Sequence, residues 1–454
     1  MWDESRQAVN AAEMLHNGKL LVTYFGDKPD MWNTKPPLLI WVQAALFWLF
    51  GANEITLRLP SAIAGLATTG LLLWFGTRVL RSPLLGLLSA LVLLTTSGYV
   101  DQHITRTGEY DAPLVFFTTW YVLSFYHYLE EGHRRSLWHT GLGITLAILT
   151  KGVVGAFFLP ALLLYTVATR KLLPLLSRRE VYVMVAAVLA VVVLYYGTRE
   201  LVNPGYWQAV YENELGGRLF KPDNKYVTPW SWYLDMLVHD ELLPWLYTFP
   251  LGFAALLHPV APASFRRLAL LLTICVVFLL TLLSASATKY NWYEAPIYPF
   301  CALLAGAGLA LVAEAFVIHL RTEHRPWPLL LLLIGLFAVP TKTIWNESFY
   351  PDQDDTLFGK LIRHQAKEFG QITSYTMLSG VDYNSSMEFY RLAAMRNYGH
   401  TVRAAYPWQI RTIVPGETVL VCNPKMRARV DSLFTATPIF EEESCATLLI
   451  TAAK

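Results

Sequence analysis

The sequence is poor in charge for its length. Charged residues make up 15% of its 454 residues, whereas hydrophobic residues make up 54%, and the mean hydropathy is +0.36. This balance is too apolar for a soluble enzyme of this size. The formal net charge of +2 gives no electrostatic reason to expect a nucleic-acid partner. We therefore expect an integral membrane protein that does not bind nucleic acid.

Cysteine is also scarce, and its spacing excludes a common class of site. The four cysteines show no CxxC spacing, so a zinc or redox motif of that kind is not indicated. Cys275 and Cys301 lie in apolar runs, where we expect them to be packing residues. Cys422 and Cys445 can pair if the C-terminal region lies outside the cytosol; the sequence leaves this pairing open. The chain has no internal repeat and no low-complexity tract.

Apolar runs account for most of the chain. A membrane-spanning helix needs about 20 apolar residues, and we find ten such runs, at residues 59–80, 83–101, 112–131, 137–150, 152–170, 181–197, 242–258, 268–286, 293–320 and 327–343. An eleventh run, 36–51, is shorter, begins with two prolines and carries two tryptophans. It either spans the membrane or lies flat at the interface as an aromatic-rich helix.

Basic residues fall in alternate gaps between the ten runs, so that one orientation satisfies the positive-inside rule. The residues predicted to be cytoplasmic are Arg81, Arg134, Arg135, Arg170, Lys171, Arg178, Arg179, Arg266, Arg267, Arg321 and Arg325. This orientation places residues 101–111, Lys151, 198–241, 286–292 and everything after about 343 outside. We favour the flat arrangement of 36–51 because the run is short. Residues 1–58 then lie outside too, and we expect a further helix before Met1.

The expected fold class is an all-α polytopic membrane domain with a small C-terminal α/β domain. The expected parts are a first extracytoplasmic loop with juxtamembrane helices (1–58), the transmembrane domain (59–343) and the α/β extracytoplasmic domain (344–454). In the last part, the β-like runs "GETVLVCN" and "CATLLITA" alternate with the helix-like segment "SSMEFYRLAAMRNYG".

Polar and charged groups collect on the predicted outer side, where their cost near the membrane usually reflects a function. They are Asp3, Glu4, Lys35, Arg106, Glu109, Asp111, Lys151, Arg218, His239, Lys289, Tyr290 and Tyr293. Fixed cations hold a phosphate or diphosphate leaving group, and a carboxylate accepts a proton from an attacking hydroxyl. Nearby aromatic residues can line a sugar or lipid groove or simply form an interface belt; these are Trp207, Trp230, Trp232, Tyr233 and Trp245.

Taken singly, nearly every one of these residues has a simpler structural explanation. Asp3 and Glu4 can favour the start of a helix, Asp111 can be an N-terminal cap, and Arg218 can be a solvated loop residue. The lysines can be snorkelling anchors, although the two prolines after Lys35 make a plain anchor less favoured there. The functional interpretation therefore depends on the whole set lying on one side.

The N-terminal segments "DESRQAVNAAEMLHNGKLLVTYFGD" and "KPPLLIWVQAALFWLFGANEITLRLPSAIAG" resemble the first outer loop of the C-type-fold glycosyltransferases that use lipid-linked sugars. The resemblance is strongest to the undecaprenyl-phosphate aminoarabinose transferase family and extends more distantly to the protein O-mannosyltransferases. The matching features are, in order, Asp3-Glu4, Glu13-Met14-Leu15, Lys35-Pro36, Phe50-Gly51 and Arg58-Leu59-Pro60. The segments "EYDAPLVFF", "LTKGVVG", "TPWSWYLDMLVHDELLPW" and "SATKYNWYEAPIYPFCALLAG" continue the resemblance to about residue 310.

The resemblance implies a C-type fold and a membrane glycosyltransferase. Such an enzyme moves a hexose or pentose from a polyprenyl-phosphate donor to a lipid A-like or other envelope acceptor, with inversion, on the outer side of the bacterial inner membrane. The resemblance places Asp3 at the catalytic centre, with Asp111 and Glu4 as further catalytic candidates. It implies that the donor phosphate is bound by Lys35, Arg218, Lys289 and Tyr293. Further candidates are Arg58, Lys151, Arg106 and His239.

The sequence departs from this family at two positions. The aminoarabinose transferases have a Glu before Lys-Pro and a His in the long outer loop, associated with a bound zinc, whereas this chain has Thr34 and Leu215. We therefore assign no metal ligands and expect no required cofactor, while a divalent metal stays open.

Other functions also remain open. The acceptor can be a protein Ser or Thr instead of a lipid. A flippase or transporter for an anionic lipid is disfavoured, because the charges lie at helix ends and not at the bilayer midplane. A signalling or assembly protein explains the C-terminal part but not the first loop.

Overall fold

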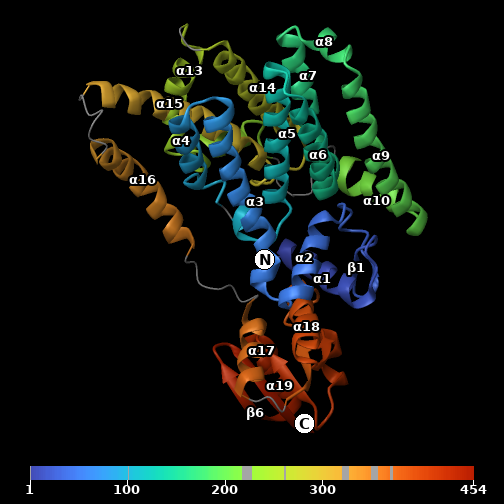
Figure 1. Cartoon of the computed structure of the whole chain (residues 1–454). Helices are drawn as coiled ribbons and strands as arrows, with labels where there is room; N and C mark the ends of the chain where they lie inside the picture. Colours follow the sequence, from blue (N-terminus) through green and yellow to red (C-terminus); the bar gives the residue numbers. More distant parts are fainter. Residues whose placement is uncertain are drawn as a thin grey trace. The chain divides into compact units, whose positions relative to one another are not determined.

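The computed structural model describes residues 2–100, 102–216, 228–259, 262–319, 327–348, 356–368 and 372–454 (Figure 1). Internal packing divides the chain into two units. Unit 1 comprises Met1–Asp30, Ile40–Leu57 and Tyr350–Lys454, and unit 2 comprises Met31–Leu39 and Arg58–Phe349. The predicted division into three parts by membrane side is a different partition and stays a prediction.

Unit 2 is built from helices. Its longer α-helices are α3 (Glu54–Trp74, which begins in unit 1), α4 (Pro83–Leu94), α5 (Asp111–Glu131), α6 (Arg134–Lys151), α7 (Leu159–Ala168), α9 (Arg179–Val202), α13 (Phe249–Leu257), α14 (Ala263–Ala285), α15 (Tyr298–His319) and α16 (Trp327–Ser348). Shorter helices are η1 (Phe75–Val79), η2 (Gln102–Arg106), η3 (Gly152–Ala156), α8 (Leu172–Leu176), α10 (Tyr206–Val210), η4 (Tyr211–Leu215), α12 (Trp232–Met236), η5 (Leu237–Glu241), η6 (Trp245–Thr248) and η7 (Ala295–Ile297).

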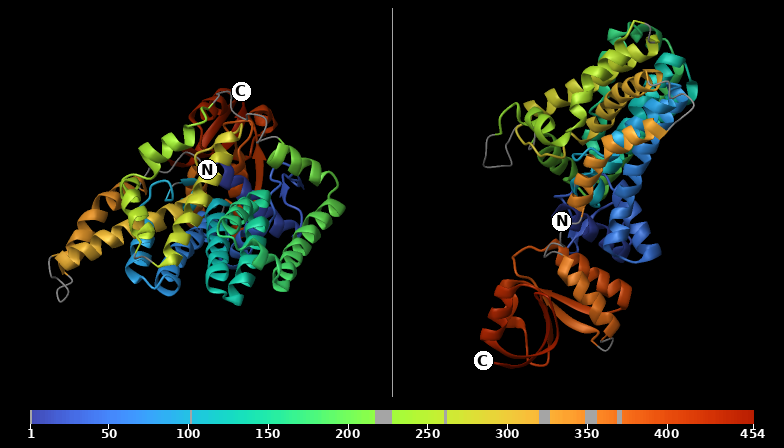
Figure 2. Two further views of the ribbon diagram at one scale, coloured as in Figure 1. Left: turned by 90° about the horizontal axis from the view of Figure 1, so that it is seen from above. Right: turned by 90° about the vertical axis from the view of Figure 1, so that its left-hand side faces the viewer.

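The long helices of unit 2 pack side by side, as Figure 2 shows. Helix α5 packs on α6, and α15 packs on α4 and α13. Each of the ten predicted apolar runs coincides with one or two of these helices. Among the described residues, six helices are long and apolar enough to cross a membrane, and four further apolar helices are shorter. The chain is a multi-pass membrane protein, while the predicted number of ten spans stays a prediction.

Local sequence signals set the ends of these helices. Ser82 precedes α4, its side chain accepts a hydrogen bond from the amide of Leu85, and Pro83 occupies the first helical position, which is the usual place for proline in a helix. Helix α5 ends at Gly132, which adopts the left-handed conformation with φ of 69°. Glycine adopts this conformation at little cost, so it terminates the helix cleanly.

The C-terminal end of α5 carries a buried ionic cluster centred on Glu130, whose side chain is 2% exposed. One carboxylate oxygen accepts from Lys171 Nζ at 2.7 Å and from the guanidinium of Arg267, and the other accepts from the hydroxyl of Tyr165 at 2.7 Å. The two basic residues come from different gaps that were both predicted to be cytoplasmic. This cluster therefore joins three separate segments at one end of α5.

We expect Glu130→Gln to lower the free energy of unfolding by about 3 kcal/mol, because the substitution leaves two cations facing one another without their shared carboxylate. This value is at the low end for a broken buried pair, since Lys171 and Arg267 are partly exposed. Thermal unfolding in detergent measures the effect. Glu131→Gln is the matched control, because the adjacent Glu131 is 44% exposed and its loss is expected to cost less than about 1 kcal/mol. Equal effects of the two substitutions would contradict this assignment.

Unit 1 combines the N-terminal helices with the C-terminal α/β fold. Its helices are α1 (Trp2–Asn17), α2 (Leu38–Phe50, whose first two residues belong to unit 2), α17 (Leu357–Glu368), α18 (Ser385–Tyr398), η9 (Pro407–Thr412) and α19 (Pro424–Leu433). Its strands are β1 (Tyr24–Phe25), β2 (Lys28–Pro29), β3 (Ser374–Leu378), β4 (Thr401–Ala405), β5 (Thr418–Val421), β6 (Phe434–Glu442) and β7 (Cys445–Ala453).

The five-stranded sheet of unit 1 has the order β4-β3-β5-β7-β6. The first three strands are parallel, and β7 and β6 add antiparallel strands at one edge. The predicted α/β character of this region is confirmed, because "GETVLVCN" and "CATLLITA" contain β5 and β7 and the predicted helix is α18. Cys422 and Cys445, whose pairing the sequence left open, form a disulfide that links the end of β5 to the start of β7.

Within unit 1, the C-terminal fold holds helix α1. Ser5 Oγ and Ser385 Oγ lie 2.5 Å apart, and Arg6 donates to the hydroxyl of Tyr383 at 2.9 Å. Arg6 also forms an ion pair with Asp30 at 2.6 Å. Burial is the largest single influence and lowers the pKa of this guanidinium, but the hydrogen bonds and charges of Asp30 and Tyr383 together outweigh burial and raise the pKa above its ordinary value. Helix α1 is therefore fixed by side chains from both the first loop and the C-terminal fold.

Candidate functional site

A small cavity in unit 2 gathers four charged side chains and a tyrosine from five separate segments. Two lysines, two carboxylates and a tyrosine face it, namely Lys35, Lys151, Asp111, Glu214 and Tyr293. The rest of the lining is mostly apolar and comprises Leu114, Val154, Phe157, Leu282, Leu283 and Ser286. The cavity has a volume of about 70 Å³, which holds several water molecules but is much smaller than a typical ligand pocket. The enclosed part is therefore of the size of a single head group.

Asp111 and Lys151 form the buried ion pair of this cavity. Asp111 is the first residue of α5 and Lys151 is the last residue of α6, two helices that pack on one another. Lys151 Nζ donates to Asp111 Oδ1 at 2.5 Å, and both side chains are less than 10% exposed. The Lys151 ammonium also lies 5.7 Å from the centroid of the Tyr293 ring. A pair this deeply buried keeps each partner in place because neither charge has a solvated alternative.

Lys35 forms a second ion pair in the same cavity. Its Nζ lies 3.3 Å from Glu214 Oε1 and 5.7 Å from the centroid of the Tyr110 ring. The hydroxyl of Thr34 donates to the same oxygen of Glu214 at 3.1 Å. The carboxylate of the long outer loop thus contacts the two adjacent residues 34 and 35.

The backbone at Thr34 is held by a buried tyrosine. The hydroxyl of Tyr206 donates to the carbonyl oxygen of Thr34 at 2.6 Å. The guanidinium of Arg199, which is almost fully buried, lies 4.6 Å from the centroid of the Tyr206 ring. Pro36 then fixes the backbone after Lys35. These contacts restrict where the Lys35 side chain can reach.

An aromatic group lies on the predicted outer loop that contains Lys289. The ring of Trp292 stacks on His103 with centroids 3.7 Å apart and on Tyr290 with centroids 4.8 Å apart. The Tyr293 ring meets the Tyr290 ring edge to face at 5.4 Å. Lys289 is buried, and its Nζ donates to the carbonyl oxygen of Ser286, which lines the cavity, at 2.8 Å.

The structure brings some of the predicted site residues together and leaves others apart. Lys35, Asp111, Lys151 and Tyr293 line one cavity, and Lys289 contacts its rim. The remaining candidates of unit 2 do not line it; Arg58 lies on α3, Arg106 ends η2, Glu109 is buried just before α5, and His239 is exposed on η5. Arg218 lies outside the described residues.

The predicted acid pair belongs to unit 1. Asp3 and Glu4 occupy the first turn of α1, where Asp3 is exposed and Glu4 is buried. Their roles stay predictions that rest on the resemblance of the first loop.

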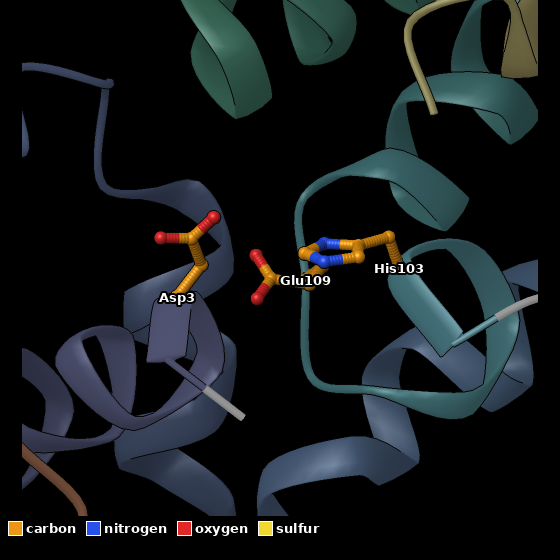
Figure 3. Close-up of side chains that lie close together, drawn as sticks. All are labelled: Asp3, His103 and Glu109. Atoms are coloured by element: carbon orange, nitrogen blue, oxygen red, sulfur yellow. The ribbon is translucent and has the colours of Figure 1, made fainter. Parts of the chain in front are cut away.

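Two potential metal ligands of unit 2 lie close to one another. The ligand atoms of His103 and Glu109 are within 4.8 Å, and Figure 3 draws both side chains together with Asp3 of unit 1. Within the part of unit 2 that the structure describes, no third His, Cys, Asp or Glu completes a set of three. Catalytic zinc sites have three protein ligands, so the described residues of unit 2 do not by themselves supply one.

Sequence reasoning missed Glu214. This residue stands next to Leu215, the position where the aminoarabinose transferases are expected to carry a His, and it contacts Thr34, where those enzymes are expected to carry a Glu. A carboxylate therefore lies beside Lys35 in this chain, but it comes from the long loop and not from the first loop. The feature of the sequence that could have pointed to Glu214 is the acidic segment "ENELGGRLF", in which it lies just before the predicted arginine.

Sequence comparisons identify relatives of this chain. A family model described as dolichyl-phosphate-mannose-protein mannosyltransferase matches residues 34–196. An undecaprenyl phosphate-alpha-4-amino-4-deoxy-L-arabinose arabinosyl transferase from Erwinia tasmaniensis is 27% identical over 318 residues, which cover 68% of this chain and 55% of that protein. An uncharacterized protein from Aquifex aeolicus is 30% identical over 161 residues, which cover 36% of this chain and 31% of that protein. The chain thus spans less than two thirds of both relatives.

The structural comparison covers more of this chain than the sequence comparisons do. The crystal structure of ArnT from Cupriavidus metallidurans bound to undecaprenyl phosphate superposes with a TM-score of 0.70 at 18% identity, covering 98% of this chain and 93% of that chain. Identity this low shows the shared fold and not a shared substrate. The chain therefore has the fold of ArnT, and over about two thirds of its length it is similar in sequence to the undecaprenyl-phosphate aminoarabinose transferases.

Proposed function

We propose that the chain is an integral membrane glycosyltransferase that moves a sugar from a polyprenyl-phosphate donor to a lipid acceptor of the lipid A type or to another envelope acceptor. The observation that carries the proposal is the cavity of unit 2, where two lysines from distant segments meet two carboxylates beside an apolar wall. The named activity of the arabinosyl transferases and the undecaprenyl phosphate bound to ArnT support the same donor class.

The two lysines are suited to a phosphate leaving group. Lys35 and Lys151 are largely buried, and a cation in a desolvated site stabilises developing negative charge much more strongly than one in water. Glu214 and Asp111 hold them in place before the donor binds. Lys289, Tyr293 and Arg218 are further proposed phosphate contacts, the last of them on the resemblance alone.

The apolar wall is suited to the first isoprene units of the donor. Leu114, Val154, Phe157, Leu282 and Leu283 line the cavity on one side, and burying isoprenoid surface there contributes roughly 25 cal/mol per Å². Trp292, on the predicted outer loop that contains Lys289, stacks on Tyr290 of the same loop and on His103 of η2, and these rings are suited to the face of a sugar. Phosphate, lipid and sugar thus each have a chemically matched surface within unit 2.

The proposed reaction is a single inverting displacement. The bond between the anomeric carbon and the phosphate oxygen breaks, and the electron pair leaves with the polyprenyl phosphate. An acceptor oxygen forms the new bond on the opposite face of the sugar. A hydroxyl acceptor passes its proton to a carboxylate, for which Asp3 and Asp111 are the candidates and Glu4 a further one. A phosphate acceptor needs no base, and the carboxylate then only orients it.

The proposed location is the bacterial inner membrane, with the site and the C-terminal domain on the extracytoplasmic side. The positive-inside rule supports this orientation, as does the position of Lys171 and Arg267, which pair with Glu130 at the opposite end of α5 from the cavity. Membrane lipids and the lipid-linked donor are the proposed partners. Arg58, Arg106 and His239 stay weaker candidates because they do not line the cavity of unit 2.

Covalent transfer tests the proposal. The protein in lipid vesicles is given radiolabelled polyprenyl-phosphate sugars with either a bacterial membrane lipid extract or a Ser/Thr-containing peptide. We expect label in the lipid acceptor with an inverted anomeric configuration. Label found only in the peptide would show that the acceptor is a protein Ser or Thr instead of a lipid. Movement of the donor across the vesicle membrane without a covalent product would reject the transferase in favour of a transporter.

The role of Asp3 is tested in the same assay. We expect Asp3→Asn to lower turnover while the protein stays folded, since the substitution removes the charge without changing the size of the side chain. Asp27→Asn is the matched control, because Asp27 is another exposed aspartate of unit 1 and no role is proposed for it. Equal turnover of the two variants would remove Asp3 from the mechanism.

A further inference from the structure

A second and larger cavity lies entirely within unit 1. The end of α2, the turn that follows it, the first turn of α3, helix α17 and the end of α18 enclose a groove of about 970 Å³. This volume is in the range of small-molecule binding sites. None of the proposed catalytic residues lines it, so the transferase proposal leaves the groove without a role.

One side of the groove is apolar and unusually exposed. Trp48, Phe50 and Ile55 are 68%, 66% and 76% exposed. Ile55 lies in the first turn of α3, and α3 begins one of the helices that are long and apolar enough to cross a membrane. A membrane-crossing α3 would enter the bilayer near Ile55, at an interface where tryptophan is enriched. Exposed apolar side chains in such a place are suited to contact with lipid.

The other side of the groove carries positive charge. Glu54 is neutralised, because Arg363 donates to both of its carboxylate oxygens at 2.8 and 2.9 Å. The hydroxyl of Tyr390 also donates to Glu54 at 2.7 Å. Arg396 is exposed, and in the part of the chain that the structure describes it forms no ion pair. The groove is left with one net positive charge, which favours an anionic ligand.

The floor of the groove is held firmly. Asn397 accepts from the amide of Ala52 at 3.0 Å and donates to the carbonyl oxygen of the same residue at 2.8 Å. Gly51 adopts φ of +82°, and a Cβ there would lie 3.2 Å from the Asn397 side chain. Arg396 Nε donates to the carbonyl oxygen of Phe47 at 3.4 Å. These bonds connect α18 to the α2–α3 turn and keep the arginine beside the aromatic side chains.

We propose that this groove binds an anionic glycerophospholipid of the surrounding membrane. The phosphate of the head group lies against Arg396 and the side-chain donors of Asn53 and Tyr398, and an acyl chain lies along Trp48, Phe50 and Ile55. Charge-assisted bonds to arginine give the phosphate its affinity, and the exposed aromatic side chains bury the acyl chain. The site is separate from the proposed transfer reaction and does not depend on it.

Lipid retention by the full-length protein tests the proposal. Delipidated protein in detergent is incubated with phosphatidylglycerol or phosphatidylcholine of identical acyl chains, and bound lipid is counted by native mass spectrometry. We expect about tenfold preference for phosphatidylglycerol, because its head group is anionic, whereas the choline of phosphatidylcholine adds a positive charge that the positively charged groove repels. The variant Trp48→Ala/Arg396→Gln is expected to lose this preference. The matched control is Trp408→Ala/Arg411→Gln, which alters an exposed tryptophan and an exposed arginine outside the groove.

Three outcomes would overturn the proposal. Equal retention of the two lipids by the wild-type protein would show that the groove does not select an anionic head group. Equal loss in the groove variant and in the control would show that the retained lipid is bound elsewhere. Displacement of phosphatidylglycerol by a lipid A extract, but not by excess phosphatidylglycerol of another chain length, would assign the groove to an acceptor lipid. Circular dichroism and thermal unfolding of each variant establish that the fold is intact in every comparison.

Discussion

Lys35→Ala is expected to lower sugar transfer from a polyprenyl-phosphate donor by about 100- to 1,000-fold, the usual cost of removing one group that stabilises charge in a transition state. Lys35 is the cation fixed between Glu214 and the Tyr110 ring, and the hydrogen bond from Tyr206 to Thr34 sets the backbone beside it. The loss is expected mainly in kcat, because the charge on the phosphate grows as the sugar leaves. Steady-state kinetics in vesicles measure it.

The comparison variant for Lys35 is Lys28→Ala. Lys28 is an exposed lysine only seven residues earlier in the sequence, so the two substitutions change the net charge equally. We expect Lys28→Ala to retain nearly full transfer. A rise in KM with unchanged kcat in Lys35→Ala would mean that the lysine binds donor without stabilising the departing phosphate, and full activity of Lys35→Ala would reject its role.

Single and double substitutions of the Asp111–Lys151 pair are expected to have different effects on stability and on transfer activity. Asp111→Asn leaves the Lys151 ammonium buried without its counter-ion, at a cost of about 3–5 kcal/mol in the free energy of unfolding. Lys151→Met leaves the carboxylate in the same state. The double variant removes both charges, and we expect it to recover most of this loss. Transfer activity is expected to stay at least about 100-fold below wild type in all three variants.

An ion pair on the protein surface provides the control for these three variants. Asp431 forms a partly exposed ion pair with Arg427 on α19, and Asp431→Asn is expected to change stability by less than about 1 kcal/mol. If the double variant of Asp111 and Lys151 recovers activity together with stability, then the pair serves the fold alone. If neither single variant loses stability, then each charge of the pair reaches water without its partner, and the pair does not stabilise the fold.

Periodicity and composition predicted most of the architecture. Apolar runs identify helices because a helix in lipid must satisfy its own backbone, and short β-like runs identified strands β5 and β7. The order of short motifs in the first 310 residues predicted the C-type fold, which the superposition on ArnT confirms. The number of spans was not predictable in the same way, because helices such as α4 and α7 are apolar but short.

The sequence did not predict which distant residues pair with one another. Glu214 is 179 residues from Lys35, and an acidic residue in a polar loop gives no sign of its partner. The association of the first loop with the C-terminal fold rests on ordinary side chains such as Ser5 and Ser385, which carry no periodicity. The sequence also left the disulfide open, because pairing requires a geometry that only the adjacent strands β5 and β7 provide.

The predicted topology places helix α5 across the membrane, so that its length can be compared with the thickness of a bilayer. Asp111 and Glu130 are nineteen positions apart, a rise of about 28 Å at 1.5 Å per residue, which is close to the roughly 30 Å of hydrocarbon in a typical bilayer. Each end of the helix carries a charge cluster that cannot enter hydrocarbon cheaply. In that topology, lipids with much longer tails would pull one charge cluster into the hydrocarbon, and lipids with much shorter tails would expose apolar side chains of the helix to water. The spacing of two acids on a single helix would then set the acyl-chain length that suits the protein.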